Sequence, residues 1–138
     1  GPRYLVPPDQ TMRAGASSRE HAIASSSVEA ARQLESPAII TITRSGFSAA
    51  LVSSYRPPMP IFAVCTDQAV QRQLNGVWGV RPLLASDVEI NYDALTEFGQ
   101  AAVVASGMGS AGQSVVVTAG FPFNTAGSTN VMRIEQIS

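Results

Sequence analysis

Short runs of β-branched and apolar residues alternate with segments of helical spacing along this chain, and that alternation restricts the possible folds more than any other feature. Residues 38–43, 60–64 and 114–118 form three of these runs. Their length and composition are typical of strands buried on both faces. Strands that alternate with helices pair in parallel through right-handed crossovers. The pattern therefore predicts an α/β fold with three α/β/α layers.

Four segments have the spacing of helices. Ser17 and Glu20 stand at capping-box spacing and open a helix expected over residues 18–35. A second helix is expected from Phe47 to the prolines after Arg56, a short third helix after Asp67, and a longer fourth helix after a strand at residues 77–84. The residues expected to repeat on one face of each helix are Ile23, Ser26, Ala30 and Leu34; Phe47, Ala50, Leu51 and Ser54; Val70 and Leu74; and Leu95, Phe98, Ala102 and Ala105.

The last two strands are connected differently from the others. A glycine-rich loop joins residues 114–118 to the final strand at residues 129–136. This loop is too short for the helical crossover that a parallel pair needs, so the final strand is expected to run antiparallel. The fold class that results is a mixed five-stranded sheet, mostly parallel, with helices on both faces. Periodicity does not encode the order of the strands.

The chain length of 138 residues suits a single domain, which we place at residues 17–138. Gly1 and Pro2 are typical of what remains after a tag is cleaved. The prolines at positions 7 and 8 indicate a linker. Residues 1–16 are therefore expected to be a tag remnant and linker.

Composition argues against several classes of function. All nine basic residues are arginine, and ten acidic residues bring the formal net charge to −1, so no basic stripe is available for nucleic acid or an anionic membrane. Cys65 and His21 are the sole cysteine and histidine and lie far apart in the sequence, so no metal site is expected. The apolar runs are shorter than the roughly 20 residues of a membrane helix. We expect a soluble cytoplasmic protein.

The strongest candidate site joins the first strand to its helix and consists of Thr43, Arg44, Ser45, Gly46, Phe47 and Ser48. A phosphate placed there would meet backbone N–H groups at the start of a helix, three side-chain hydroxyls and a guanidinium. Open α/β sheets also tend to bind ligands at the carboxyl ends of their strands. The alternative is an ordinary helix cap with no ligand.

A second loop, residues 119–128, is expected to leave the sheet at the same edge and to cover a ligand held by the first. Its candidate contacts are Phe121, Asn124 and Gly127. The alternative is a plain connecting loop. Neither loop has the Gly-Lys-Ser/Thr ending of a Walker loop.

No convincing set of catalytic groups is evident. Asp87, Glu89, Asp93 and Glu97 surround a predicted helix start, where acidic side chains are favoured by the helix dipole. Cys65 ends a buried strand, with the only histidine in another unit, so it is expected to be an inert packed thiol. These patterns predict no catalytic residue in this chain.

Four segments, in their order and spacing, resemble the C-terminal regulatory domain of pyruvate kinase. They are Ile39-Ile40-Thr41-Ile42-Thr43-Arg44-Ser45-Gly46, Tyr55-Arg56-Pro57-Pro58-Met59-Pro60-Ile61-Phe62-Ala63-Val64, Trp78-Gly79-Val80-Arg81-Pro82, and Thr118-Ala119-Gly120 with Gly127-Ser128-Thr129-Asn130. The resemblance runs from about residue 20 to the end of the chain.

The resemblance implies a five-stranded mixed sheet and a tetramer in which these domains pack together. It also implies that residues 43–48 grip a phosphate of a sugar phosphate or nucleotide effector, with residues 121–127 folded over it. Bisphosphate-activated members use an arginine for the second phosphate where this chain has Asn91, a possible second anchor, so a sugar monophosphate or AMP is expected rather than fructose 1,6-bisphosphate. The family's catalytic barrel, with its magnesium, potassium, ADP and phosphoenolpyruvate sites, has no counterpart here.

The leading hypothesis is therefore a regulatory and oligomerisation domain. It would bind a phosphorylated metabolite and control the glycolytic transfer of phosphate from phosphoenolpyruvate to ADP by a barrel outside this chain. One alternative is a structural assembly domain without an effector. Others are a stand-alone phosphometabolite-binding protein or a small independent enzyme, although this chain alone is not expected to be catalytic.

Overall fold

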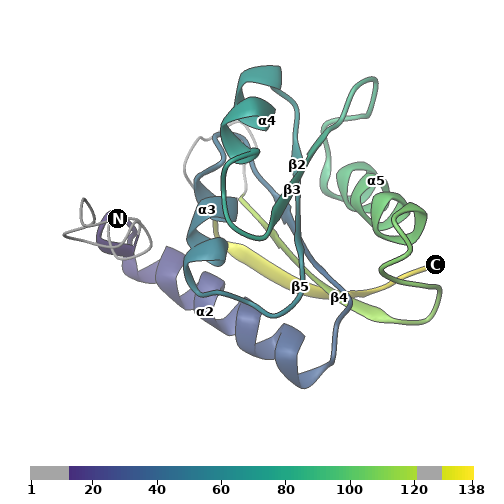
Figure 1. The fold of residues 1–138 in the computed structure, drawn as a ribbon, viewed down its shortest axis with the longest axis horizontal. Coiled ribbons are helices and arrows are strands. Elements are labelled where there is room, and N and C mark those ends of the chain that lie inside the picture. Colours follow the sequence, from purple (N-terminus) through teal and green to yellow (C-terminus); the bar gives the residue numbers. More distant parts are fainter. Residues whose placement is uncertain (1–12, 121–128) are drawn as a thin grey trace.

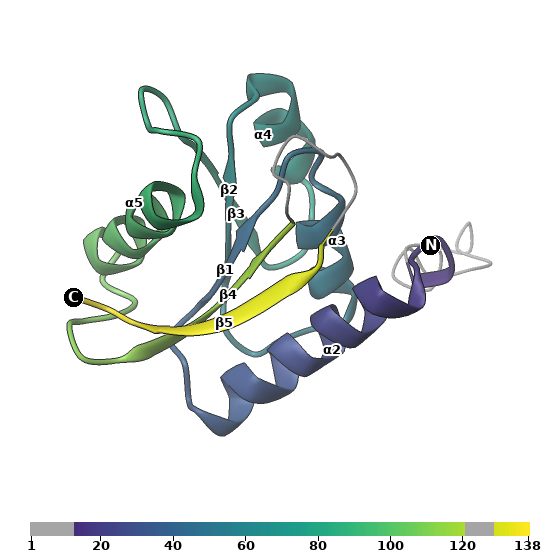
Figure 2. The ribbon, with the colours of Figure 1, turned by 180° about the vertical axis from the view of Figure 1, so that it is seen from behind.

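A computed structural model describes residues 13–120 and 129–138, which form a sheet with helices on both faces (Figures 1 and 2). The strand order is β3-β2-β1-β4-β5. The elements, in chain order, are α2 (Ser18–Gln33), β1 (Ile39–Ile42), α3 (Phe47–Ser54), β2 (Ile61–Cys65), α4 (Gln68–Leu74), β3 (Val80–Leu84), α5 (Tyr92–Ala105), β4 (Ser114–Ala119) and β5 (Val131–Gln136).

The pairing of the strands confirms the predicted mixed sheet. β1 pairs in parallel with β2 and with β4, β2 pairs in parallel with β3, and β5 runs antiparallel to β4. The loop between β4 and β5 is too short for a crossover, which is why the last strand reverses direction. The fold class expected from the sequence is thus observed.

Two apolar clusters fill the space between the layers. The first joins α2, α3 and α4 to one face of the sheet, with Ile39, Ile61 and Val116 at its centre. The second joins α5 to the opposite face, with Ile40 and Val64 at its centre. Figure 1 shows α5 separated from the other helices by the sheet. The central strands are buried on both faces, which explains their uninterrupted apolar runs.

The start of the long helix α2 was predicted correctly, but its buried face was not. Ser17 Oγ accepts the Glu20 N–H, and Glu20 Oε1 accepts the Ser17 N–H, so the capping box is present. α2 ends at Gln33 rather than residue 35. Its buried residues are Ala24, Ser27, Val28 and Ala31. The predicted series was Ile23, Ser26, Ala30 and Leu34, of which Ile23 and Ala30 are half-buried and Ser26 and Leu34 are exposed. Small side chains on the buried face let the helix approach the sheet closely.

The other helices agree more closely with their predicted faces. Val70 and Leu74 of α4 are both buried, as expected. In α5, Leu95 is buried, Phe98 and Ala102 are half-buried, and Ala105 is exposed. Thr96, Gly99 and Val103 complete the buried face of α5. A Cβ on Gly99 would lie 2.9 Å from Ile40 Cγ2, so only glycine lets α5 sit this close to the sheet.

The third strand begins later than expected. β3 starts at Val80, whereas the apolar run begins at Val77. The preceding residues form a turn in which the Val80 N–H donates to Val77 O at 3.2 Å, and Gly79 has a φ of +70°. Trp78 is 51% exposed and lies outside the core. The turn uses a backbone conformation that the hydropathy of the run does not reveal.

Candidate functional site

The candidate loop, residues 43–48, lies where the sheet changes its direction of winding. From β1 the chain moves outward through β2 to β3, and it then returns to place β4 on the other side of β1. The helices α3 and α4 pack on one face, while α5 packs on the other. In open α/β sheets, the crevice at the carboxyl ends of the strands flanking such a switch point is the usual ligand site. The topology therefore places the predicted loop at a favourable position.

Hydroxyl groups within the loop hold its backbone in shape. Thr43 is buried, its N–H donates to Val64 O at 2.9 Å, and its Oγ1 accepts the Gly46 N–H at 2.9 Å. Ser45 Oγ accepts the Phe47 N–H at 3.3 Å. Two of the amides that a phosphate could use are thus occupied by the loop's own hydroxyls. An anion that uses these amides must displace Thr43 Oγ1 and Ser45 Oγ.

Gly46 is the residue that turns the chain into α3. It is the N-cap of this helix and has a φ of +91°. A Cβ at this position would lie 3.4 Å from Val70 Cγ1 and from Leu74 Cδ2 of α4. These are ordinary contact distances, so the left-handed conformation is what explains why this position is glycine.

Two further amides belong to the first turn of α3, those of Ser48 and Ala49. The Ala50 N–H donates to Gly46 O at 3.1 Å and so begins the helical hydrogen bonds. Within residues 13–120 and 129–138, the Ser48 and Ala49 N–H groups have no acceptor. Such groups at a helix start carry partial positive charge and attract anions. The Ser48 side chain is buried beside them, while Arg44 and Ser45 are exposed.

The second predicted loop is only described at its two ends. Phe121, Asn124 and Gly127 lie outside the described residues. The Asn130 N–H donates to Ala119 O at 3.1 Å, which closes the base of the loop at the carboxyl end of β4. Since β4 is the direct neighbour of β1, the bases of both loops stand at the same edge of the sheet.

Thr41 and Thr118 were not predicted as part of this region. They are register partners on β1 and β4, so their side chains share one face of the sheet. Both residues are fully buried, and neither hydroxyl has a hydrogen-bond partner within the described part of the chain. Their position in apolar strand runs gave no signal, because register is a property of the paired strands.

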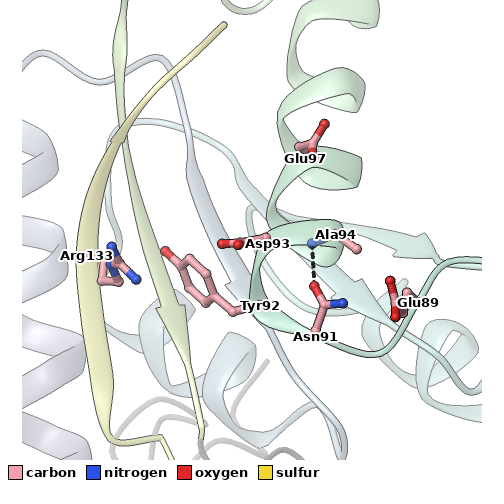
Figure 3. Close-up of a pocket in the computed structure, with 7 residues that line it drawn as sticks. All are labelled: Glu89, Asn91, Tyr92, Asp93, Ala94, Glu97 and Arg133. Atoms are coloured by element: carbon pink, nitrogen blue, oxygen red, sulfur yellow. Dashed lines mark hydrogen bonds between the residues drawn. The ribbon is translucent and has the colours of Figure 1, made fainter.

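Asn91 caps a helix on the opposite side of the sheet. It is the N-cap of α5, and its Oδ1 accepts the Ala94 N–H at 2.8 Å. It is exposed and lines a cavity of about 510 Å³ (Figure 3). The other lining residues are Glu89, Tyr92, Asp93, Ala94, Glu97 and Arg133. With three carboxylates against one arginine, this cavity is electrostatically poor for a phosphate.

Tyr92 and Arg133, which line this cavity, form a linked group with Glu135. Tyr92 Oη donates to Glu135 Oε2 at 2.6 Å, and Arg133 Nε lies 3.5 Å from the same carboxylate oxygen. The Arg133 guanidinium also lies 5.0 Å from the centre of the Tyr92 ring. Burial, together with the hydrogen bond to Glu135 and its charge, raises the pKa of Tyr92. Tyr92 is thus a neutral hydrogen-bond donor that ties α5 to β5.

Cys65 is packed in the sheet rather than presented to a ligand. It is fully buried, and its Sγ lies 3.4 Å from Leu83 O. Burial is the main cause that raises the pKa of its thiol, which disfavours the reactive thiolate. No group of three or more metal-ligating His, Cys, Asp or Glu residues occurs in the part of the chain that the structure describes. Among these residues, no helix has the length and apolarity to span a membrane.

Comparison with known proteins decides the family. The family model described as "Pyruvate kinase, alpha/beta domain" matches residues 21–135. The chain belongs to this family. A pyruvate kinase from Agrobacterium vitis is 39% identical over 116 residues, which cover 84% of this chain and 24% of that protein. One from Geobacillus stearothermophilus is 41% identical over 117 residues, covering 85% of this chain and 20% of that protein.

The chain thus spans about a quarter or less of the pyruvate kinases that it matches. A relative from Lactobacillus delbrueckii subsp. bulgaricus, 37% identical over 116 residues, shows the same proportion, with 84% of this chain and 20% of that protein covered. The family match includes the whole candidate loop and Asn91. The resemblance inferred from four sequence segments is confirmed.

Proposed function

We propose that this chain is a regulatory domain that binds a phosphorylated metabolite at residues 43–48. In this role it controls phosphate transfer from phosphoenolpyruvate to ADP by a catalytic barrel in the same enzyme. That barrel, and the magnesium and potassium that its chemistry uses, would belong to the three-quarters of the relatives' length that this chain does not span. A cytoplasmic location accompanies this proposal, because glycolytic substrates are found there.

The observation that carries the proposal is the start of α3 at the topological switch point. The Ser48 and Ala49 amides there lack an acceptor among the described residues, and the hydroxyls of Thr43 and Ser45 stand within the same loop. Arg44 is exposed beside them. Three charge-assisted hydrogen bonds at about 1.5–3 kcal/mol each, less the cost of association, support binding in the millimolar to micromolar range.

The effector that fits best carries a single phosphate. By the resemblance, Asn91 takes the position of the arginine that bisphosphate-activated members use for the second phosphate, and its Oδ1 already caps α5. The carboxylates of Glu89, Asp93 and Glu97 line the adjoining cavity and would repel a second phosphate. A sugar monophosphate or AMP is therefore favoured over fructose 1,6-bisphosphate.

Calorimetry on the purified chain tests this proposal. AMP, ribose 5-phosphate and fructose 1,6-bisphosphate are titrated into the wild type, Arg44→Glu and the control Arg19→Glu, which reverses an exposed arginine on α2. Loss of one charge-assisted contact and its replacement by repulsion should weaken monophosphate binding at least about tenfold in Arg44→Glu, with little change in Arg19→Glu. Equal affinity in wild type and Arg44→Glu would exclude residues 43–48 as the site.

A structural assembly domain without an effector is the second candidate, and the edge strand β5 favours it. Among the described strands, β5 pairs only with β4, so one side of its backbone has no neighbouring strand. Ile134, near its middle, is 54% exposed. An exposed edge strand with an apolar centre is suited to pairing with another chain. We propose that this edge is a contact between like subunits, whether or not the domain also binds an effector.

Light scattering distinguishes the two candidates when it is combined with the calorimetry. Assembly without an effector predicts a dimer or tetramer and no heat with any phosphometabolite. Ile134→Lys should shift the assembly toward monomer, because a charged edge residue disfavours strand pairing. Arg81→Lys, a conservative change at an exposed position on the opposite edge strand β3, is the control. A wild type that is monomeric at all concentrations would exclude the assembly role.

A further inference from the structure

Arg13, in the segment immediately before α2, is held through both its side chain and its backbone. Its guanidinium donates to Ser54 O at 2.5 Å and to Ser54 Oγ at 3.3 Å, and it lies 4.0 Å from the centre of the Tyr55 ring. Its carbonyl oxygen accepts a hydrogen bond from His21 Nε2. His21 Nδ1 in turn lies 2.7 Å from Tyr55 Oη. We call these four residues, Arg13, His21, Ser54 and Tyr55, the Arg13 cluster.

The Arg13 cluster closes the carboxyl end of α3, the same helix whose first turn forms the candidate phosphate site. Ser54 is the last residue of α3, and its carbonyl is among those that the helix itself cannot satisfy. A guanidinium at this end also complements the negative end of the helix dipole. The candidate loop and the Arg13 cluster therefore lie at opposite ends of one helix of eight residues, about 12 Å long.

The body of α3 is packed tightly enough to move as a unit. Ala49, Leu51 and Val52 are at most 1% exposed, and they pack against α2 and the sheet. Figures 1 and 2 both show α2 and α3 side by side on one face of the sheet. Close-packed interiors transmit displacements rather than absorbing them. A change in the contacts at one end of α3 is thus expected to displace the other end.

A second contact fixes the same end of α3 from the side of β3. Ser53 Oγ donates to Trp78 O at 2.5 Å, and the Arg56 guanidinium lies 4.7 Å from the centre of the Trp78 ring. Arg13 holds the helix end from the α2 side, and Trp78 holds it from the β3 side. Removal of the Arg13 guanidinium would leave the His21–Tyr55 hydrogen bond as the remaining polar contact of the cluster on the α2 side. The end of α3 would then be held less firmly on that side, so its axis could tilt and shift the Ser48 and Ala49 amides.

We infer that Arg13 is a positioning residue for the candidate loop, residues 43–48, and acts on it through α3. This inference rests on the function proposed above. It assigns a role to a residue that lies at the far end of α3 from the candidate loop, in the segment immediately before α2. The coupling is reciprocal, so a ligand at residues 43–48 would tighten the attachment of that segment.

The first test measures affinity in the full chain. Calorimetry with AMP and ribose 5-phosphate compares the wild type with Arg13→Met and with the control Arg19→Met, which removes an equal charge from a nearby exposed position. We expect Arg13→Met to weaken binding about fivefold and Arg19→Met to leave it unchanged, since coupling between two sites is commonly of this size. Arg13→Lys keeps the charge without the planar fork and should fall between them.

The second test needs no ligand. Hydrogen exchange compares the amides of residues 47–50 with those of the core strand β2 in the same variants. Positioning through α3 predicts faster exchange at residues 47–50 in Arg13→Met with β2 unchanged, whereas a general loss of stability would accelerate both. Arg13→Lys provides the same comparison if Arg13→Met does not fold.

The outcomes separate this inference from the proposed function. If residues 47–50 exchange at the wild-type rate in Arg13→Met, or accelerate only together with β2, Arg13 does not position the loop. If exchange at residues 47–50 alone is faster in Arg13→Met but the wild type binds neither AMP nor ribose 5-phosphate, the positioning role is supported and the effector site is excluded. If AMP or ribose 5-phosphate binds equally well to the wild type and Arg13→Met, and exchange at residues 47–50 is unchanged, the effector site is supported and the positioning role of Arg13 is excluded.

Discussion

Thr41 and Thr118 lie opposite each other in register on the neighbouring parallel strands β1 and β4, and both of their hydroxyls are buried without a partner in the described part of the chain. Thr43, two residues further along from Thr41, is equally enclosed, but its Oγ1 accepts the Gly46 N–H. Three buried threonines near one sheet edge thus differ in whether the hydroxyl is satisfied.

Replacement of these threonines by valine should therefore have opposite effects on stability. Thr41→Val or Thr118→Val removes an unsatisfied hydroxyl at nearly constant volume and should leave stability unchanged or raise it by about 1 kcal/mol. Thr43→Val leaves the buried Gly46 amide without its acceptor and should cost about 1–3 kcal/mol. Urea unfolding of the three variants measures these changes. A loss in Thr41→Val as large as that in Thr43→Val would contradict the difference in hydrogen bonding.

Gly46→Ala should destabilise the domain and weaken ligand binding together. The left-handed φ of +91° costs a non-glycine residue about 1–2 kcal/mol, whereas the added Cβ would make only ordinary contacts with Val70 and Leu74 of α4. Relief of this strain would move the amides of the loop. Thermal unfolding and AMP calorimetry provide the two measurements.

Gly76→Ala is the matched control for Gly46→Ala. Gly76 does not have a positive φ, and a Cβ there would meet no atom within 4 Å. Its replacement should leave both stability and affinity close to wild type. If Gly46→Ala behaves like Gly76→Ala, the loop does not depend on the left-handed turn.

The Tyr92 to Glu135 hydrogen bond predicts a loss of stability at high pH. Because burial and Glu135 raise the pKa of Tyr92 in the folded state, the phenol keeps its proton there after it has ionised in the unfolded chain. The unfolded state then binds fewer protons, so the free energy of unfolding falls as pH rises above about 10. Below that pH this contribution is fully present.

Urea midpoints between pH 8 and pH 11 measure this contribution in the wild type and in Tyr92→Phe. The phenylalanine variant lacks the ionisable group, so its midpoint should fall less steeply over this range. The control is Tyr55→Phe, which removes a phenol bonded to His21 rather than to a carboxylate. Parallel curves for the wild type and Tyr92→Phe would show that Tyr92 does not titrate differently in the two states.

Local patterns in the sequence predicted most of the elements of the fold. The capping box of Ser17 and Glu20, the inward Val70 and Leu74, and the reversal of the last strand depend on residues within a turn or a short loop of one another. Hydrogen bonding and steric limits at that range act in any context. The candidate loop at residues 43–48 was recognised for the same reason, since its chemistry is contiguous.

Tertiary structure decided what depends on distant partners. The strand order that sets β4 beside β1, the pairing of Thr41 with Thr118, and the burial of Ala24 rather than Ile23 on α2 all arise from packing between separate elements. Arg13 lies in a stretch that composition marks only as a linker, yet its partner Ser54 is 41 residues away. No local pattern records such a contact, because its energy exists only once the layers have come together.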